Sequence, residues 1–130
     1  MLFRSTLSRL ESVFAHTLGI NRHLPPECAP ALGRYDGDAY FGGGAWYVAT
    51  LAAAEFCYRA ALRCPAPATC DWLTRGDAFV ATVRRYTPDS GDLSEQIDRD
   101  TGEQRSAQHL TWSYAAFITC IAARGAALRN

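Results

Sequence analysis

Residues 45–62, AWYVATLAAAEFCYRAAL, predict a helix that is apolar on nearly every side. Only Glu55 and Arg59 are charged, and they stand four positions apart, as neighbours on one helix face do. A helix without a polar face must be surrounded by protein. The many alanines also permit close helix–helix approach, so we expect this segment to be an inner helix of a larger helical assembly.

Three further helices are predicted around it. Residues 5–18 and 71–85 have one apolar stripe each and read as outer helices, the second with Asp71 as its N-cap. Residues 110–128 are apolar until late in the segment and read as another inner helix. No segment shows the alternation of a strand. The predicted fold class is therefore all-α, a double ring of helical hairpins of which only some are present.

Three irregular connections separate these helices. Residues 21–31 and 63–69 contain prolines, including Pro65 and Pro67, which interrupt helices. Residues 86–108 are polar, rich in turn-forming residues and without a clear period. Connections of this length within a compact domain are uncommon and often functional.

The composition excludes several classes of partner. Thirteen basic and thirteen acidic residues balance within 130, so neither nucleic acid nor an anionic membrane surface is indicated as a partner. No apolar run reaches transmembrane length. Arg4, Arg9 and Glu11 stand where a signal peptide would be apolar, so the sequence predicts no export signal.

The cysteines and histidines predict no metal and no other cofactor. The five cysteines are odd in number and lack a CxxC pair, which favours reduced thiols over a disulfide framework or a zinc site. A bridge between Cys64 and Cys70 remains open, because these residues flank a proline-rich loop. The histidines do not cluster at ligand spacing; they are His16, His23 and His109.

A glycine-rich loop precedes the first inner helix. Residues 31–46, ALGRYDGDAYFGGGAW, place Arg, Asp and Tyr between glycines that permit tight turns or close approach to a ligand. Arg34 can donate two parallel hydrogen bonds to a carboxylate or to sugar oxygens. The pattern fits a binding site or a network of turns. Because no Lys-Ser or Lys-Thr follows the glycines, a phosphate-binding loop is not indicated.

The candidate reactive group is Glu95, within residues 89–114, DSGDLSEQIDRDTGEQRSAQHLTWSY. Cleavage of a glycosidic bond uses two carboxyl groups, and a loop carboxylate beside aromatic rings fits one of them. Trp112 and Tyr114 follow at a helix entry, where they could form a wall against a sugar ring. A solvated loop carboxylate without a role is the competing interpretation. Composition does not separate Glu95 from the other carboxylates of this loop, which are Asp89, Asp92, Asp98, Asp100 and Glu103.

Two long motifs resemble one enzyme family. GRYDGDAYFGGGAWYVATLAAAEF, residues 33–56, and LSEQIDRDTGEQRSAQHLTWSYAAFITC, residues 93–120, are similar to the glucoamylases, glycoside hydrolase family 15, and most closely to bacterial members. The resemblance extends more weakly over nearly the whole chain. It implies an (α/α)6 barrel of six helical hairpins, with residues 1–130 as a C-terminal fragment of the catalytic domain.

The resemblance also implies a reaction and the residues that perform it. The reaction is inverting hydrolysis of terminal α-1,4 bonds of starch and maltodextrins, which releases β-D-glucose, so an α-glucan is the implied substrate. The base of the family's Ser-Glu-Gln motif falls on Glu95, with Ser106 placed to hydrogen-bond it. The implied substrate-binding residues are Arg34, Asp38, Tyr40, Trp46 and Trp112.

Some features of the family are missing or altered. Its general acid lies in an upstream Trp-Glu-Glu type motif, which this sequence lacks. We therefore expect the N-terminal part of the barrel to be a required partner and the isolated chain to be nearly inactive. Departures at Ile97, at Gln108 and at the pair Asp36-Gly37 bear on fine specificity rather than on the reaction class.

Two alternatives remain from the sequence. The chain could be a non-catalytic, truncated helical module that binds carbohydrate weakly or docks onto a partner. It could also be an unrelated helical scaffold with thiol chemistry at Cys57 or Cys64, although no base accompanies either thiol.

Overall fold

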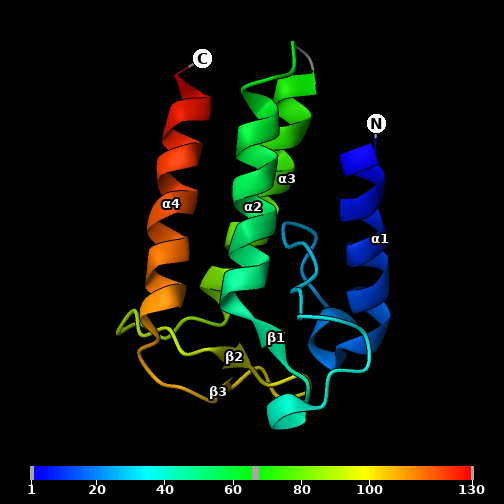
Figure 1. Cartoon of the computed structure of the whole chain (residues 1–130), viewed down its shortest axis with the longest axis vertical. Helices are drawn as coiled ribbons and strands as arrows, with labels where there is room; N and C mark the ends of the chain where they lie inside the picture. The colour runs from blue at the N-terminus through cyan, green and yellow to red at the C-terminus, as the bar shows by residue number, and fades with distance from the viewer. Residues whose placement is uncertain (1, 66–67, 130) are drawn as a thin grey trace.

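Four helices account for most of the structure, a computed structural model that describes residues 2–65 and 68–129. They lie side by side with alternating chain direction (Figure 1) and comprise α1 (Leu2–Thr17), α2 (Tyr47–Ala61), α3 (Ala68–Arg85) and α4 (Thr111–Leu128). All four were predicted, α1 and α3 from a single apolar stripe and α2 and α4 from their nearly continuous apolar sequence. Pro67 of the predicted loop lies outside the described residues.

The start of α3 differs from its prediction. The helix begins at Ala68, so Asp71 lies in its first turn and is not the N-cap. An acidic side chain at this position still faces the positive end of the helix dipole, which is stabilising. Asp71 therefore marks the beginning of the helix through its charge rather than through a capping hydrogen bond.

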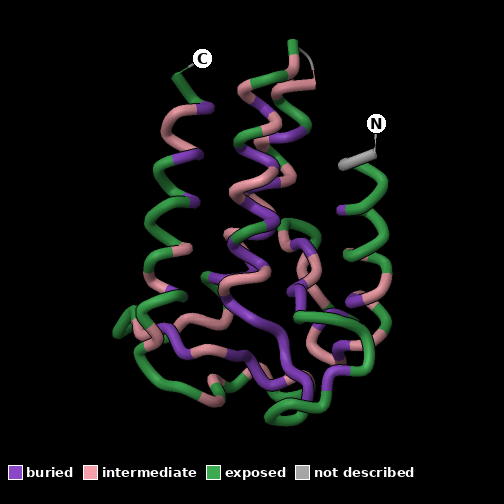
Figure 2. The backbone as a smooth tube through the Cα atoms, viewed as in Figure 1, coloured by how far each residue is buried: buried purple, intermediate pink, exposed green. Residues whose placement is uncertain are grey.

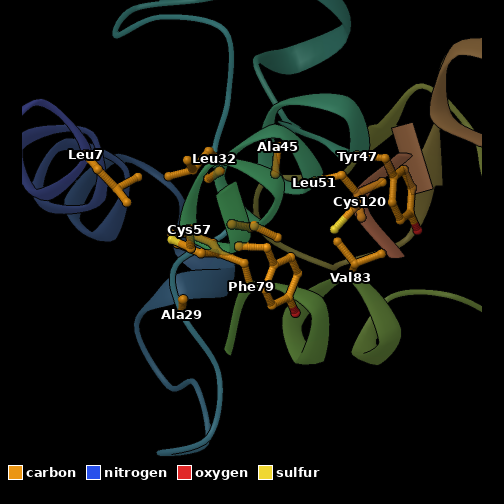
Figure 3. Close-up of a cluster of buried hydrophobic side chains, with 14 of the residues drawn as sticks. Leu7, Ala29, Leu32, Ala45, Tyr47, Leu51, Cys57, Phe79, Val83 and Cys120 are labelled. Atoms are coloured by element: carbon orange, nitrogen blue, oxygen red, sulfur yellow. The ribbon is translucent and has the colours of Figure 1, made fainter. Parts of the chain in front are cut away.

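Helix α2 forms the centre of the molecule, as its sequence predicted. Its side chains Tyr47, Leu51 and Cys57 are completely buried and meet Phe79 and Val83 of α3 (Figure 3). Alanines on α2 are also fully buried, which allows α3 and α4 to approach its backbone closely. Both of these helices pack mainly on α2 and only slightly on each other.

Helix α4 differs from the expectation for an inner helix, because only the side that faces α2 is covered (Figure 2). Cys120, Ala123 and Ala127 are buried, whereas Ile118 is 67% exposed and Leu128 is 57% exposed. An apolar helix with one open face has fewer neighbours than its sequence is adapted to.

A small sheet that the sequence did not predict joins the loops at one end of the helices. Strands β1 (Ala45–Trp46), β2 (Gln96–Ile97) and β3 (Gln104–Arg105) are antiparallel in the order β1-β2-β3. Each strand has two residues, which is too short for an alternating pattern to be recognised. The sheet lies at the end where α2 and α4 begin (Figure 1).

The turn between β2 and β3 is closed by Asp98. Its carboxylate accepts hydrogen bonds from the backbone N–H groups of Asp100 (2.9 Å) and Thr101 (2.8 Å) and pairs with Arg105 at 2.7 Å. These bonds, led by the backbone ones, lower the pKa of Asp98. Asp98 is therefore committed to the shape of the hairpin.

Asn21 fixes the connection between α1 and the glycine-rich loop. Its side-chain amide donates to the carbonyls of Phe14 and Ala31, each at 2.9 Å, and accepts from the Ala31 N–H at 2.8 Å. This ties the proline-containing segment to the end of α1 without regular structure. Within the described parts of the chain, no helix combines the length and apolarity needed to cross a membrane.

Candidate functional site

The segment around Glu95 connects the beginnings of α2 and α4. The Tyr47 N–H at the start of α2 donates to the Glu95 carbonyl at 3.4 Å. The Ser113 hydroxyl, in the first turn of α4, donates to the Ser94 carbonyl at 2.7 Å. Residues 94–95 are therefore tied to the first turns of both helices.

The carboxylate of Glu95 is held by Ser106. The Ser106 hydroxyl donates a short hydrogen bond to Oε2 of Glu95, and the Glu95 N–H donates to the Ala107 carbonyl at 2.8 Å. Ser106 has a φ of 66°, a left-handed backbone conformation that non-glycine residues rarely adopt. Such conformations often occur at functional sites. The loop after β3 thus fixes both the main chain and the side chain of Glu95.

Arg34 and Asp38 form a two-bond ion pair within the glycine-rich loop. Nε and Nη2 of Arg34 each donate to one carboxylate oxygen of Asp38 at 2.8 Å, and the Tyr40 N–H donates to the same carboxylate at 3.0 Å. The Arg34 hydrogen bonds, opposed by burial and assisted by the Tyr40 N–H, lower the pKa of Asp38 to about 2. The same pairing raises the pKa of Arg34. Both groups are therefore charged at neutral pH.

Aromatic rings extend from this ion pair towards α4. The guanidinium carbon of Arg34 lies 4.9 Å from the ring centre of Tyr40 and 4.8 Å from that of Trp46. Trp46 lies 6.3 Å from Tyr40 and meets Trp112 edge-on at 6.4 Å. Tyr40 and Trp112 are about half exposed, whereas Trp46 is buried. Exposed ring faces beside a fixed cation and carboxylate are suited to binding a neutral polyhydroxylated ligand.

The small sheet connects the two halves of the site. Trp46 on β1 pairs with Gln96 on β2, and Glu95 directly precedes Gln96. All seven residues expected from the sequence thus lie on segments that the sheet and the starts of α2 and α4 hold together. They divide into two contact groups: Glu95 with Ser106, and a cluster of Arg34, Asp38, Tyr40, Trp46 and Trp112.

Two side chains in this region were missed by sequence reasoning. Gln96 is completely buried, and its Oε1 accepts from the Gly44 N–H at 3.3 Å. Gln104 bonds to the main chain on both sides of Leu93, at Asp92 and Ser94. The sequence signal for Gln96 was its position directly after Glu95. No local pattern indicates Gln104, because its role depends on how β3 folds back.

The run of three glycines serves close packing. A Cβ at Gly44 would lie 2.3 Å from the Ile97 carbonyl oxygen, and one at Gly43 would lie 1.9 Å from that of Asp38. Gly43 also has a φ of 68°. These glycines let the loop fold onto β2 and around Asp38, which places Arg34 against the rings.

The thiols and metal-binding side chains form no second centre among the described residues. All five cysteines are free, and burial raises the pKa of both Cys57 and Cys120 to about 12. Such thiols remain protonated and unreactive at neutral pH. Across residues 2–65 and 68–129, no three histidine, cysteine, aspartate or glutamate side chains gather as metal ligands.

Comparison with known proteins relates this site to one family. The sequence profile of the glycosyl hydrolases family 15 matches residues 66–122. Glucoamylase P of Amorphotheca resinae is 36% identical in an alignment that includes 85% of this chain and 24% of that protein. Glucoamylase of Neurospora crassa is also 36% identical, over 82% of this chain and 22% of that protein.

Two solved glucoamylase structures also superpose on this chain. The family 15 glucoamylase from Hypocrea jecorina superposes on 95% of this chain with a TM-score of 0.82 at 31% identity, using 26% of its own length. Hormoconis resinae glucoamylase does so with a TM-score of 0.84 at 33% identity, using 27% of its length. The helices and the loops between them therefore align with part of an (α/α)6 structure.

These relatives are fungal, so the expectation of a bacterial-type sequence is wrong. A resemblance carried by two motifs indicates a family and does not by itself fix the lineage of the sequence. The chain spans about a quarter of the length of the relatives it matches. It is a homologue of the glucoamylases of glycosyl hydrolases family 15, corresponding to one part of their helical domain.

Proposed function

We propose that this chain provides the general-base side of a glucoamylase active site. The complete site would hydrolyse terminal α-1,4-linked glucose of starch and maltodextrins by inversion and release β-D-glucose. The observation that carries the proposal is the Ser106 hydrogen bond to Glu95, at the starts of α2 and α4 of a chain homologous to glucoamylases. A loop carboxylate without a role would not need a partner in a left-handed backbone conformation.

In this proposal, Glu95 removes a proton from water as the water attacks the anomeric carbon. A carboxylic acid on the other side of the sugar protonates the leaving oxygen, as inverting hydrolysis requires. Oε2 of Glu95 accepts from Ser106, so Oε1 is the oxygen that would take the proton. The Ser106 hydrogen bond fixes the orientation of the carboxylate.

The cluster around Arg34 would bind the glucose unit. Arg34 offers its remaining charged donors to sugar hydroxyls. Asp38, whose side chain is only 4% exposed, would contribute by fixing the guanidinium before substrate arrives. Tyr40 and Trp112 offer exposed ring faces against which a pyranose can pack. Trp46 lies between them and sets their spacing.

The general acid and the rest of the cleft would come from residues outside these 130. The relatives are about four times as long as the segment matched, and the open apolar face of α4 is suited to contact further helices. The partner in this proposal is therefore the remainder of an (α/α)6 barrel. Without it, we expect no measurable turnover.

The test is a chimera in which residues 1–130 replace the matching quarter of glucoamylase P from Amorphotheca resinae. We expect the chimera to release glucose from maltose and maltodextrins. Glu95→Gln should lower kcat by about 10²–10⁴-fold, the usual contribution of a general acid or base. Glu103→Gln, which changes an exposed glutamate of the same loop, should leave kcat unchanged. Full activity of the Glu95→Gln chimera would refute the assignment of the base.

A non-catalytic helical module is the second candidate. The observation in its favour is the open face of α4, which would be a docking surface if no barrel forms. Saturable maltose binding by a folded chimera without turnover would favour this alternative. Burial of Cys57 and the raised pKa of its thiol speak against thiol chemistry at that residue.

A further inference from the structure

Gln104 on β3 bonds to the main chain just before Glu95 from both sides of Leu93. Its Nε2 donates to the Asp92 carbonyl at 2.6 Å, and its Oε1 accepts from the Ser94 N–H at 3.0 Å. A side-chain amide has one donor and one acceptor side, like a peptide group. The side-chain amide of Gln104 therefore pairs with residues 92–94 as the peptide group of a neighbouring strand would.

The residue that holds the carboxylate, Ser106, follows directly after β3. Ser106 stands two residues after Gln104, just past the end of β3, and its left-handed backbone turns the chain there. Gln104 bonds to the main chain that enters Glu95, while Ser106 bonds to its side chain. Strand β3 and the residue directly after it thus hold both the main chain that leads into Glu95 and its carboxylate.

The main chain from Leu93 to Glu95 has a partner for each polar group. The Leu93 N–H donates to the Tyr114 hydroxyl at 3.0 Å, the Leu93 carbonyl accepts from Leu110 at 3.1 Å, and the Glu95 N–H donates to Ala107. Ser94 is buried, so water could not take over the hydrogen bond that its N–H donates to Gln104. Loss of the amide would leave this donor unpaired and release the segment.

We propose that Gln104 is a positioning residue for Glu95. This inference rests on the proposed function, because it assigns Gln104 to the placement of the proposed base. Its effect should appear in kcat rather than in KM, since its side chain bonds to the main chain beside Glu95, at Asp92 and Ser94, and not to the Arg34 cluster. Displacements of about 1 Å at a reacting group cost up to about 10²-fold in rate.

The first test uses the 130-residue chain and amide hydrogen exchange. Gln104→Met retains the volume and removes both bonds, and it should accelerate exchange at Ser94 at least about tenfold. Gln104→Glu retains an acceptor for the Ser94 N–H but sets its second oxygen against the Asp92 carbonyl, so its protection should lie between those of Gln104→Met and wild type. Glu103→Met introduces the same side chain at the exposed neighbouring position and should have no effect. Unchanged Ser94 exchange in Gln104→Met would overturn the proposal.

The second test measures kinetics in the chimera with glucoamylase P. Gln104→Met should lower kcat by about 10–100-fold with KM within about twofold, and Gln104→Glu should lie between it and the parent. Glu103→Met, at the exposed neighbouring position, should match the parent. Accelerated Ser94 exchange with a parental kcat, or a raised KM with an unchanged kcat, would refute a positioning role. A folded but inactive parental chimera would refute the proposed function and this inference with it. An active parent with unaffected Gln104 variants would refute the inference alone.

Discussion

Asp38 shows at the scale of a residue how the candidate site resists acid. Its pKa is lowered from 3.8 to about 2, chiefly by the Arg34 hydrogen bonds, so folding favours its ionised form. A carboxyl group with a depressed pKa stabilises the fold above its unfolded pKa, and this contribution disappears as pH falls through its folded pKa. We expect the stability difference between wild type and Asp38→Asn to be constant above about pH 5. It should shrink between about pH 4 and about pH 2.

Urea unfolding of both proteins across this range measures the difference. Asp36→Asn removes an exposed carboxylate from the same loop and is the charge-matched control. A difference between wild type and Asp38→Asn that stays constant down to pH 2 would show that the Arg34 pair does not stabilise the folded state in the way the geometry indicates.

Ser106 combines a useful hydroxyl with an unfavourable backbone conformation. At a φ of 66° a glycine is unstrained, whereas any residue with a Cβ costs about 1 kcal/mol or more. Both Ser106→Ala and Ser106→Gly lose the bond to Glu95, so their comparison isolates the backbone term. We expect Ser106→Gly to be more stable than Ser106→Ala by about 1 kcal/mol in urea unfolding.

Ser90 supplies the control for this pair. It is not among the residues with left-handed backbone in the described chain. There, alanine should be the more stable replacement, because glycine adds freedom to the unfolded state. The same order at both positions would contradict a special backbone conformation at Ser106.

Individual site residues were predictable to different degrees. Arg34, Asp38 and Glu95 stand in motifs that resemble a family, and the structure gives each a specific partner or neighbour. Their catalytic and binding roles stay predictions until the chimera is tested. Gln104 could not be predicted, because its partners lie 10 and 12 residues away and meet it only once the β2–β3 hairpin forms.

At the scale of the elements, the contact between α2 and α3 depends on Gly76. A Cβ at this position would lie 2.6 Å from the Tyr58 ring, which is fully buried and hydrogen-bonded to Asp77 through its hydroxyl at 2.6 Å. The ring cannot move without breaking that bond or separating the helices. We expect Gly76→Ala to destabilise the chain by about 1–3 kcal/mol, despite the better helix propensity of alanine.

Gly125 on α4 is the matched control for Gly76. There, the nearest group to a new Cβ is the Arg129 guanidinium at 3.3 Å, the end of a flexible side chain that can move aside. Gly125→Ala should therefore be neutral or stabilising by up to about 1 kcal/mol. Equal losses for the two variants in urea unfolding would argue against close packing of α3 on Tyr58.

The elements were predicted well where periodicity is long. The four helices extend over 15 to 18 residues, enough for several turns of an apolar pattern. The strands have two residues each, and the pairing of β1 with β2 joins segments about fifty positions apart, Trp46 with Gln96. Such contacts leave no local signature. The sheet that fixes the candidate site was therefore beyond sequence reasoning, while the helices that support it were not.

At the scale of the whole molecule, α4 was predicted correctly as a helix but not in how far it is covered. Its composition indicated an inner helix, and the structure covers only the side towards α2. The apolar residues of α4 suit a helix that is covered on every side. In this structure, only neighbours from these 130 residues can cover it. The alignment with about a quarter of each solved glucoamylase is consistent with this difference.

Ile118 provides a test of whether the open face of α4 is a contact surface. It is 67% exposed, so Ile118→Ala in the 130-residue chain should change the free energy of unfolding by no more than about 0.5 kcal/mol. In the chimera with glucoamylase P, further helices should cover this face, and the same change should cost about 2 kcal/mol or more. Leu51 is fully buried already, so Leu51→Ala should be costly in both proteins, by about 2–5 kcal/mol. Urea unfolding of the four variants decides the matter: an Ile118→Ala loss as small in the chimera as in the chain would mean that α4 meets no further helix and that the barrel does not close over it.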